Sequence, residues 1–253
     1  MHVVIQLKSP REIETMAAGG RILAATHAHV KPAIVPGITT REIDAMVESF
    51  IRSHAGATPS FKGLYGFPAS ACISVNDEIV HGIPAAKRVL NEGDIVTVDI
   101  GVHYGGFHTD SAWTYPVGKI SPETQRLLDV TEASLWAGIE QARVGNHIGD
   151  IGAAVEAVVV KGKFTIVRDL VGHGVGAAMH EDPQVPNYGK PKRGPKLQPG
   201  MTIAIEPMVN AGGAATRTLS DKWTIVTLDG SMAGHFEHTV AVTDAGPRVL
   251  TTL

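Results

Sequence analysis

The sequence predicts one α+β domain, residues 1–253, in which helices pack on one face of a mainly antiparallel, curved sheet. Segments with helical and strand-like patterns come in the order two helices, strands, two helices, strands. Two pairs of segments recur at almost the same spacing, which indicates a pseudo-two-fold repeat with halves at about residues 10–118 and 119–250. A chain of 253 residues is long enough for one such domain with its own core.

Capping boxes indicate the first two helices. Ser9 and Glu12 form such a box around Pro10, which suits the first helical position. A second box at Thr39 and Glu42 precedes a helical stripe of apolar residues: Ile43, Met46, Val47, Phe50 and Ile51. We therefore expect an amphipathic helix after each box.

Strands are expected next, because Gly and Pro separate short β-prone runs between residues 59 and 116. The later elements follow the same two patterns. Helices are expected after Ser121 and over residues 148–159, and further strands at 201–205, 223–228 and 239–243.

The repeat rests on two alignments. Residues 37–48 match residues 145–156 at an offset of 108, and Gly, Ile, Ala and a Val-Glu pair coincide. Residues 93–99 match residues 200–206 at an offset of 107, and both segments are β-prone runs that begin with Gly and end on a carboxylate. Coincidence between amphipathic helices and apolar strands is the alternative explanation.

The composition limits the available chemistry. Twelve histidines accompany a single cysteine, Cys72, so neither an intrachain disulfide nor a thiolate zinc cluster can form. A bound metal would have to use imidazole and carboxylate ligands, which suit hard and borderline divalent ions. The net charge of −3 does not indicate a general nucleic-acid-binding surface. Because neither a signal peptide nor an apolar run of about 20 residues is visible, we expect a cytoplasmic protein without membrane spans.

Two carboxylates, Asp99 and Asp110, lie on either side of a turn-like Tyr104-Gly105-Gly106 segment. If a hairpin turns between Tyr104 and Gly105, the carboxylates are directly opposed, with Cβ atoms about 5 Å apart. Two like charges so placed need neutralisation, and a divalent cation is the usual means. The alternatives are a solvated surface pair, or a turn displaced by one residue that puts the carboxylates on opposite faces.

The second half offers matching groups. Glu206 stands in the place of Asp99, and the surroundings of Glu237 echo those of Asp110. His173 lies between glycines, which leave its imidazole unobstructed or simply form a flexible surface loop.

Two more histidines stand in paired contexts. His81 and His180 each begin a His-x-x-Pro segment after an apolar residue, one in each half. Imidazoles from two sides of a cleft would suit proton transfer or oxyanion stabilisation. Taken singly, each also fits a surface turn.

Six motifs follow one another along the chain: Val-His-Gly-Ile-Pro at 80–84, Val-Asp-Ile-Gly at 98–101, His-Thr-Asp at 108–110, Gly-His-Gly-Val-Gly at 172–176, Ile-Glu-Pro-Met at 205–208 and Phe-Glu-His-Thr at 236–239. Together they resemble the type I methionine aminopeptidases, over about residues 10–250. The chain shows no long N-terminal extension and no large insertion, which is similar to the short bacterial form.

The resemblance implies the pita-bread fold and two adjacent divalent ions per chain, with Co, Mn, Fe or Zn as candidates. It assigns five metal ligands: Asp99, Asp110, His173, Glu206 and Glu237. Asp110 and Glu237 would bridge the ions. Asp99 would complete one ion, and His173 with Glu206 the other.

By the same resemblance, the protein removes the initiator methionine from nascent polypeptides when the second residue is small. A hydroxide activated by the two metals would attack the scissile carbonyl, with Glu206 as general base. His180 resembles the residue that polarises the scissile amide. His81 resembles the one that stabilises the tetrahedral intermediate or guides the leaving peptide.

Alignment of the motifs also implies an apolar pocket for the methionine side chain, formed by Phe61, Leu64, Phe67, Cys72, Met179 and Trp223. Leu64 and Met179 stand where the family commonly has tyrosine and phenylalanine, and His235 replaces a frequent glutamine. The slot still suits an unbranched thioether, although these changes could alter which second residue is accepted.

The expected partner is the N-terminus of a nascent polypeptide, bound by a monomer. The basic segment from Lys190 to Lys196 fits a solvated surface loop, or an electrostatic contact with ribosomal RNA. Two other functions share the fold. An Xaa-Pro dipeptidase or aminopeptidase usually carries an additional N-terminal domain, and a non-catalytic binding protein typically lacks some of the metal ligands.

Overall fold

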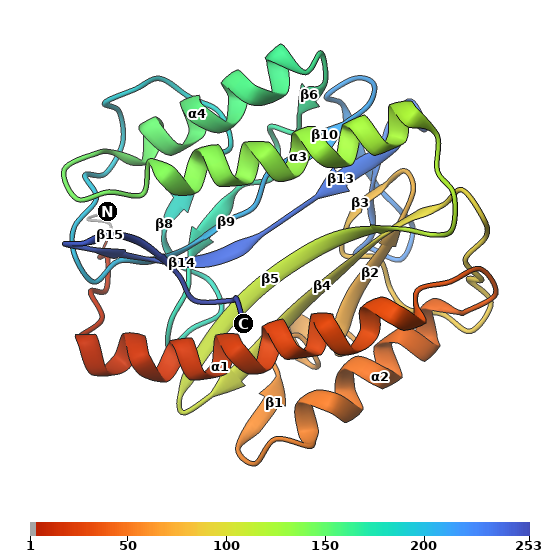
Figure 1. The fold of residues 1–253 in the computed structure, drawn as a ribbon, viewed down its shortest axis with the longest axis horizontal. Coiled ribbons are helices and arrows are strands. Elements are labelled where there is room, and N and C mark those ends of the chain that lie inside the picture. The colour runs from red at the N-terminus through yellow and green to blue at the C-terminus, as the bar shows by residue number, and fades with distance from the viewer. Residues whose placement is uncertain (1–3) are drawn as a thin grey trace.

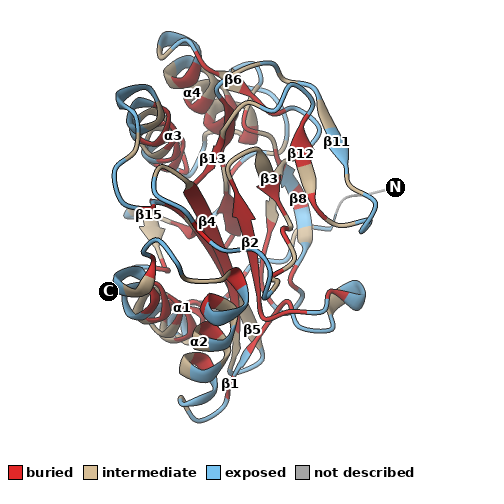
Figure 2. Ribbon diagram, turned by 90° about the vertical axis from the view of Figure 1, so that its right-hand side faces the viewer, coloured by how far each residue is buried: buried red, intermediate tan, exposed pale blue. Residues whose placement is uncertain are grey.

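The computed structural model describes residues 4–253 and confirms the α+β class. Four long helices and two short 3-10 helices are present among these residues: α1 (Pro10–Val30), η1 (Lys31–Ala33), α2 (Thr40–Arg52), η2 (Leu64–Gly66), α3 (Pro122–Glu140) and α4 (Ile148–Lys161). In Figure 1, α1 and α2 run along one edge of the molecule and α3 and α4 along the opposite edge. Figure 2 shows all four long helices on one side of the strands.

The capping boxes predicted at the starts of the first two helices are confirmed. The Ser9 side chain accepts from the Glu12 amide, and the Glu12 carboxylate accepts from the Ser9 amide. Thr39 and Glu42 make the same reciprocal pair at the start of α2. Each box satisfies amides that have no partner inside the helix, so local sequence sets these helix starts.

The first half of the chain forms a four-stranded sheet built around one long strand. Its strands are β1 (Ala57–Pro59), β2 (Ala71–Val75), β4 (Ile95–Tyr104) and β5 (Phe107–Pro116). β5 pairs along one edge of β4, and β2 and then β1 pair along the other, all antiparallel. Helices α1 and α2 cover this sheet through a buried apolar cluster.

The remaining strands form three antiparallel sheets. The five-stranded sheet has the order β15-β14-β9-β7-β8, and the two three-stranded sheets have the orders β13-β10-β6 and β11-β12-β3. Their bounds are β3 (Glu78–Val80), β6 (Thr165–Ile166), β7 (Gly172–Gly174), β8 (Glu181–Val185), β9 (Thr202–Ile205), β10 (Met208–Asn210), β11 (Thr216–Thr218), β12 (Ile225–Thr227), β13 (Ala233–His235), β14 (His238–Thr243) and β15 (Gly246–Val249). Helices α3 and α4 pack over this part through a second apolar cluster.

Hydrogen bonds join the two halves where β5 meets the start of β14. The Asp110 amide donates to Thr239 Oγ1 over 2.8 Å, and that hydroxyl donates to the Asp110 carbonyl over 2.9 Å. The Glu237 amide donates to the Ala112 carbonyl over 2.9 Å. This seam brings a carboxylate from each half to the middle of the molecule.

The hairpin between β4 and β5 turns one residue later than the spacing predicted. Tyr104 pairs with Phe107, so Gly105 and Gly106 form the turn, and the expected turn between Tyr104 and Gly105 is wrong. Both glycines have positive φ, +59° and +88°. A two-residue hairpin turn of type I′ requires positive φ at both positions, which glycine adopts at little cost.

Within residues 4–253, no helix combines the length and the apolar character that a bilayer span requires.

Candidate metal centre

The hairpin places Asp99 and Asp110 as diagonal neighbours. Asp99 pairs with Ala112 and Asp110 pairs with Gly101, so the expected direct opposition of the two carboxylates is wrong. Both still lie on one face, because a turn one residue later shifts the register by two residues and side chains alternate with a period of two. The alternative expectation, that a turn displaced by one residue puts the carboxylates on opposite faces, is therefore also wrong. Diagonal neighbours remain close enough to share a ligand.

In the other half, Glu206 follows β9 directly and Glu237 precedes β14 directly. Ile205 pairs with His238, so the same register continued by one residue sets Glu206 opposite Glu237. His173 lies in β7, next to β9, at a position where the pairing of β7 with β8 is irregular. The three side chains therefore lie in or directly next to three adjacent strands of one sheet, β14, β9 and β7.

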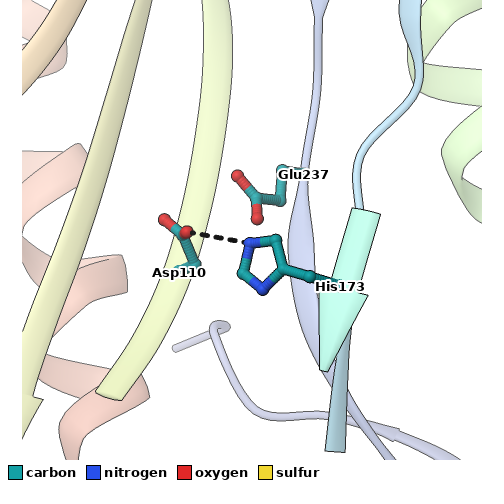
Figure 3. A group of neighbouring side chains, drawn as sticks. All are labelled: Asp110, His173 and Glu237. Atoms are coloured by element: carbon teal, nitrogen blue, oxygen red, sulfur yellow. Dashed lines mark ion pairs between the residues drawn. The ribbon is translucent and has the colours of Figure 1, made fainter. Parts of the chain in front are cut away.

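The side chains from the two halves converge. One ligand atom from each of Asp110, His173 and Glu237 lies within 4.8 Å of the others, and Figure 3 shows the three side chains pointing toward one another from separate strands. His173 Nε2 is 3.8 Å from Asp110 Oδ2 and 3.5 Å from Glu206 Oε1. Asp99, Asp110, His173, Glu206 and Glu237 all line one cavity.

The residues at this point fit a divalent cation. Each acid has one buried carboxylate oxygen without a hydrogen-bond partner: Asp99 Oδ1, Asp110 Oδ1, Glu206 Oε1 and Glu237 Oε1. Among residues 4–253, the four acids form no ion pair with lysine or arginine. Burying a carboxylate oxygen without a hydrogen-bond donor or a positive charge nearby is costly. A bound cation would both coordinate these oxygens and neutralise their charge.

The protonation of His173 is also right for a metal ligand. Its Nδ1 lies 2.8 Å from the Gly174 carbonyl, which can only accept, so Nδ1 carries the proton and donates. Burial lowers the pKa of His173 to about 4, so the ring is neutral at pH 7. The lone pair on Nε2 therefore faces the carboxylates, and an outer hydrogen bond of this kind fixes the ring of metal-binding histidines.

Burial and mutual repulsion oppose ionisation of the four acids. Burial raises the pKa of Asp99 to about 7. Burial, and next the charge of neighbouring carboxylates, raises the pKa values of Asp110, Glu206 and Glu237 well above their ordinary range. Such a cluster is stabilised in its ionised form by bound positive charge.

Asp99→Asn is expected to stabilise the metal-free protein increasingly as the pH rises from about 4 to above 7. Because the pKa of Asp99 is raised in the folded state, its protonated form favours folding. This contribution to the free energy of unfolding is fully present below the unfolded-state pKa and is lost as the pH rises through about 7. Asparagine does not ionise, so Asp99→Asn should melt roughly 5 °C higher than wild type at pH 8 and nearly level with it at pH 4. Calorimetry over this pH range checks it, with Asp129→Asn on the exposed face of α3 as control. A difference that does not grow with pH would contradict the prediction.

An apolar pocket lies against the acids in the same cavity, which has a volume of about 630 Å³. Five of the six expected pocket residues line it: Phe61, Leu64, Phe67, Cys72 and Trp223. Met179 is not among the lining residues, although it is buried in the same apolar cluster. Burial, and next the charge of Asp99, raises the pKa of the Cys72 thiol well above its ordinary value, so Cys72 acts as a pocket wall rather than a nucleophile.

His81 and His180 lie on the cavity wall. His81 follows β3 with a φ of +60°, an uncommon backbone conformation for a residue with a Cβ. The His180 ring lies 4.5 Å from the His173 ring, centroid to centroid. Burial lowers the pKa values of both His81 and His180, which keeps them neutral at pH 7.

A buried ion pair holds the segment that carries His180. The Lys8 ammonium pairs with the carboxylate of Glu181, and the two side chains are 5% and 7% exposed. The other Glu181 oxygen accepts from the Ala178 amide over 3.1 Å. A Cβ at residue 176 would lie 2.4 Å from Lys8 Cε and 2.6 Å from Glu181 Oε1, so any other residue there would displace this ion pair.

Lys8→Met is expected to lower the free energy of unfolding by roughly 3–5 kcal/mol, because it leaves the Glu181 carboxylate buried without its positive partner. Urea denaturation measures the loss. The double change Lys8→Met with Glu181→Gln should recover part of it, since no unpaired charge is then buried. Equal stabilities of wild type and the single variant would contradict this role for the pair.

The structure brings into the site two residues to which the sequence interpretation gave no role there. His235 is 2% exposed, and its Nε2 lies 3.8 Å from Glu206 Oε2 and 3.9 Å from Glu237 Oε2. The signal was available, since His235 and Glu237 are two residues apart in an extended segment and so share a face. Tyr65 also lines the cavity, beside His180. Neither the turn around Tyr65 nor its direction was evident from the sequence.

The four acids and the neutral histidine form a donor set of the kind that metal-dependent hydrolases use, and the adjoining pocket can take an apolar group. The sequence profile of metallopeptidase family M24 matches residues 14–244 of this chain. The chain belongs to this family.

Individual relatives agree with this assignment. Methionine aminopeptidase 1 of Bacillus subtilis is 52% identical over 248 residues, which cover 98% of this chain and 99% of the relative. The crystal structure of methionine aminopeptidase from Thermotoga maritima superposes with a TM-score of 0.97 at 42% identity, covering 99% of this chain and all of the other. These findings confirm the resemblance to type I methionine aminopeptidases and the pita-bread fold. Prolidase from Pyrococcus horikoshii shares the fold at 22% identity and a TM-score of 0.77, and 63% of its chain is covered.

Proposed function

We propose that the protein removes N-terminal methionine from newly made polypeptides whose second residue is small. The observation that carries this proposal is the junction, in one cavity, of the acidic cluster with a slot walled by Phe61, Phe67 and Trp223. An unbranched thioether fits such an apolar slot. The scissile bond of a bound N-terminal methionine would then lie beside the acids.

The proposal includes two divalent ions, held by the five residues that the resemblance assigns. Asp110 and Glu237, which the seam between the halves holds together, would contribute to holding both ions. Asp99 would help to hold one of them, and His173 with Glu206 the other. The ions would act as Lewis acids that polarise the peptide carbonyl and lower the pKa of water. Oxygen ligands with one imidazole suit Mn, Fe, Co or Zn.

In the proposed reaction, Glu206 takes a proton from the attacking water at Oε1 or Oε2 and passes it to the leaving amine. Its Oε1 lies 3.5 Å from His173 Nε2, which supports a role beside the ligands of the proposed ions. His180 donates a hydrogen bond to the scissile amide. His81, beside Trp223 on the cavity wall, stabilises the tetrahedral intermediate or guides the leaving peptide.

One catalytic domain made of two related halves, about 10–118 and 119–250, is part of the proposal. Two pairs of glycines that the offsets of 108 and 107 align have the same positive φ. Gly37 and Gly145 have φ of +100° and +93°, and Gly93 and Gly200 have φ of +93° and +90°. Equal backbone conformations at aligned positions support the repeat.

The proposed setting is the cytoplasm, with a monomer acting on nascent chains. The basic side chains Lys190, Lys192, Arg193 and Lys196 are all exposed. A transient contact of this loop with ribosomal RNA would be electrostatic and would weaken with salt. Changing these four residues to alanine should lower ribosome binding at low salt. Unchanged salt-sensitive binding would remove the idea without touching the catalytic proposal.

A comparison of substrates tests the specificity. Metal-loaded protein should release methionine from Met-Ala and Met-Gly peptides and leave Ala-Pro peptides intact. Cleavage of Ala-Pro in preference to Met-Ala would instead favour an Xaa-Pro peptidase, which shares the fold.

A further inference from the structure

Tyr65 has an unusual conformation at the mouth of the cavity. Its φ of +51° and ψ of +17° are left-handed, and it stands between Gly63 and Gly66, whose φ values are +87° and +89°. Its side chain is 74% exposed although it lines the cavity. A bulky residue held in this region is uncommon, and strained positions of this kind concentrate at functional sites.

The ring and the hydroxyl of Tyr65 both lie against the imidazole of His180. The two rings lie nearly parallel, at 24° and with centroids 5.8 Å apart. Tyr65 Oη is 3.5 Å from His180 Nδ1, which is the single hydrogen bond of this hydroxyl within residues 4–253. The left-handed turn therefore directs an otherwise unpartnered phenol onto a residue of the proposed catalytic machinery.

The backbone near His180 is held by other contacts. Glu181 accepts from the Ala178 amide and pairs with Lys8. These contacts fix the chain but not the rotation or the tautomer of the His180 ring. Tyr65 and His173 are the aromatic neighbours that bear on the ring itself.

A phenol is a better donor than acceptor, and an unprotonated imidazole nitrogen is a good acceptor, so Tyr65 donates to Nδ1. The proton of the neutral ring then resides on Nε2. We propose that Tyr65 is a positioning residue for His180, which holds the imidazole as the Nε2–H tautomer so that Nε2–H can donate to the reacting amide. This role rests on the proposed function of His180. In the other tautomer, Nε2 could only accept and would not stabilise developing charge on the carbonyl oxygen.

Tyr65→Phe tests this inference, because it removes the hydroxyl and keeps the ring. The matched control is Tyr188→Phe, since Tyr188 donates to the Arg168 carbonyl over 3.1 Å and does not line this cavity. We expect kcat on a Met-Ala peptide to fall about two- to tenfold in Tyr65→Phe with KM unchanged, the range for loss of one hydrogen bond. Tyr188→Phe should match wild type.

A spectroscopic reading separates this inference from the proposed function. ¹⁵N spectra of histidine-labelled, metal-free protein report each tautomer, and the His180→Gln variant assigns the signal. We expect His180 as Nε2–H in wild type and as a tautomer mixture in Tyr65→Phe. An unchanged tautomer with unchanged kcat, or a rise in KM alone, would overturn the inference. If the wild-type protein releases no methionine, the proposed function is wrong. The tautomer spectra would still show whether Tyr65 holds the His180 ring in one tautomer.

Discussion

Glu206→Gln is expected to lower kcat by about 10²- to 10⁴-fold, the range that general acid–base groups contribute. Glutamine keeps the shape of the side chain and one oxygen that can bind metal, but its amide cannot take up a proton from water. The Glu206 side chain is 13% exposed, and its Oε1 has no hydrogen-bond partner. Bulk water therefore has little access to this side chain and cannot readily replace it as the base.

Steady-state kinetics on a Met-Ala peptide test this prediction. The metal content of the same preparations is measured alongside. Much of the metal binding should be retained, since the other four proposed ligands are intact. Glu140→Gln, an exposed position on α3, serves as the control and should behave as wild type. Full activity in Glu206→Gln would remove Glu206 as the base, whatever the metal content.

Asp110→Asn is expected to weaken metal binding by at least about 100-fold, and activity should fall with it. Changes to groups that merely support metal ligands cost about 10- to 100-fold, so loss of a carboxylate that is itself a proposed ligand should cost no less. The backbone of Asp110 is bound on both sides to Thr239, so the substituted side chain remains directed into the cluster. The loss of metal affinity should therefore reflect the missing negative charge and not a displaced side chain.

Isothermal titration of metal-free protein with Mn²⁺ or Co²⁺ measures this effect, together with the rise in melting temperature on adding metal. Asp129→Asn on the exposed face of α3 is the control. If Asp110→Asn binds metal as tightly as wild type does, the proposed role of Asp110 as a metal ligand is wrong.

Local features of the sequence predicted the elements well. The boxes at Ser9 and Thr39 set helix starts that depend on contacts over three residues. The hairpin register was missed by two positions, because the spacing alone did not show that Gly105 and Gly106 form the turn. The shared face of Asp99 and Asp110 survived this error, since an even displacement keeps the same side of the strand.

The meeting of the two halves depends on long-range contacts that no local pattern encodes. Asp110 and Glu237 are 127 positions apart, and they adjoin because Thr239 and Ala112 form the seam. The resemblance to a family assigned these ligands, and the structure shows which bonds bring them together. Tyr65 was missed for a different reason, since its role depends on a left-handed turn and on a histidine from the other half.

The most direct measurement is release of methionine from a Met-Ala peptide by protein stripped with a chelator and then reloaded with Mn²⁺ or Co²⁺. The metal-free protein should be inactive, reloading should restore turnover, and Ala-Pro peptide should remain uncut. Absence of methionine release from the reloaded, folded protein, or equal release from the stripped protein, would contradict a metal-dependent methionine aminopeptidase.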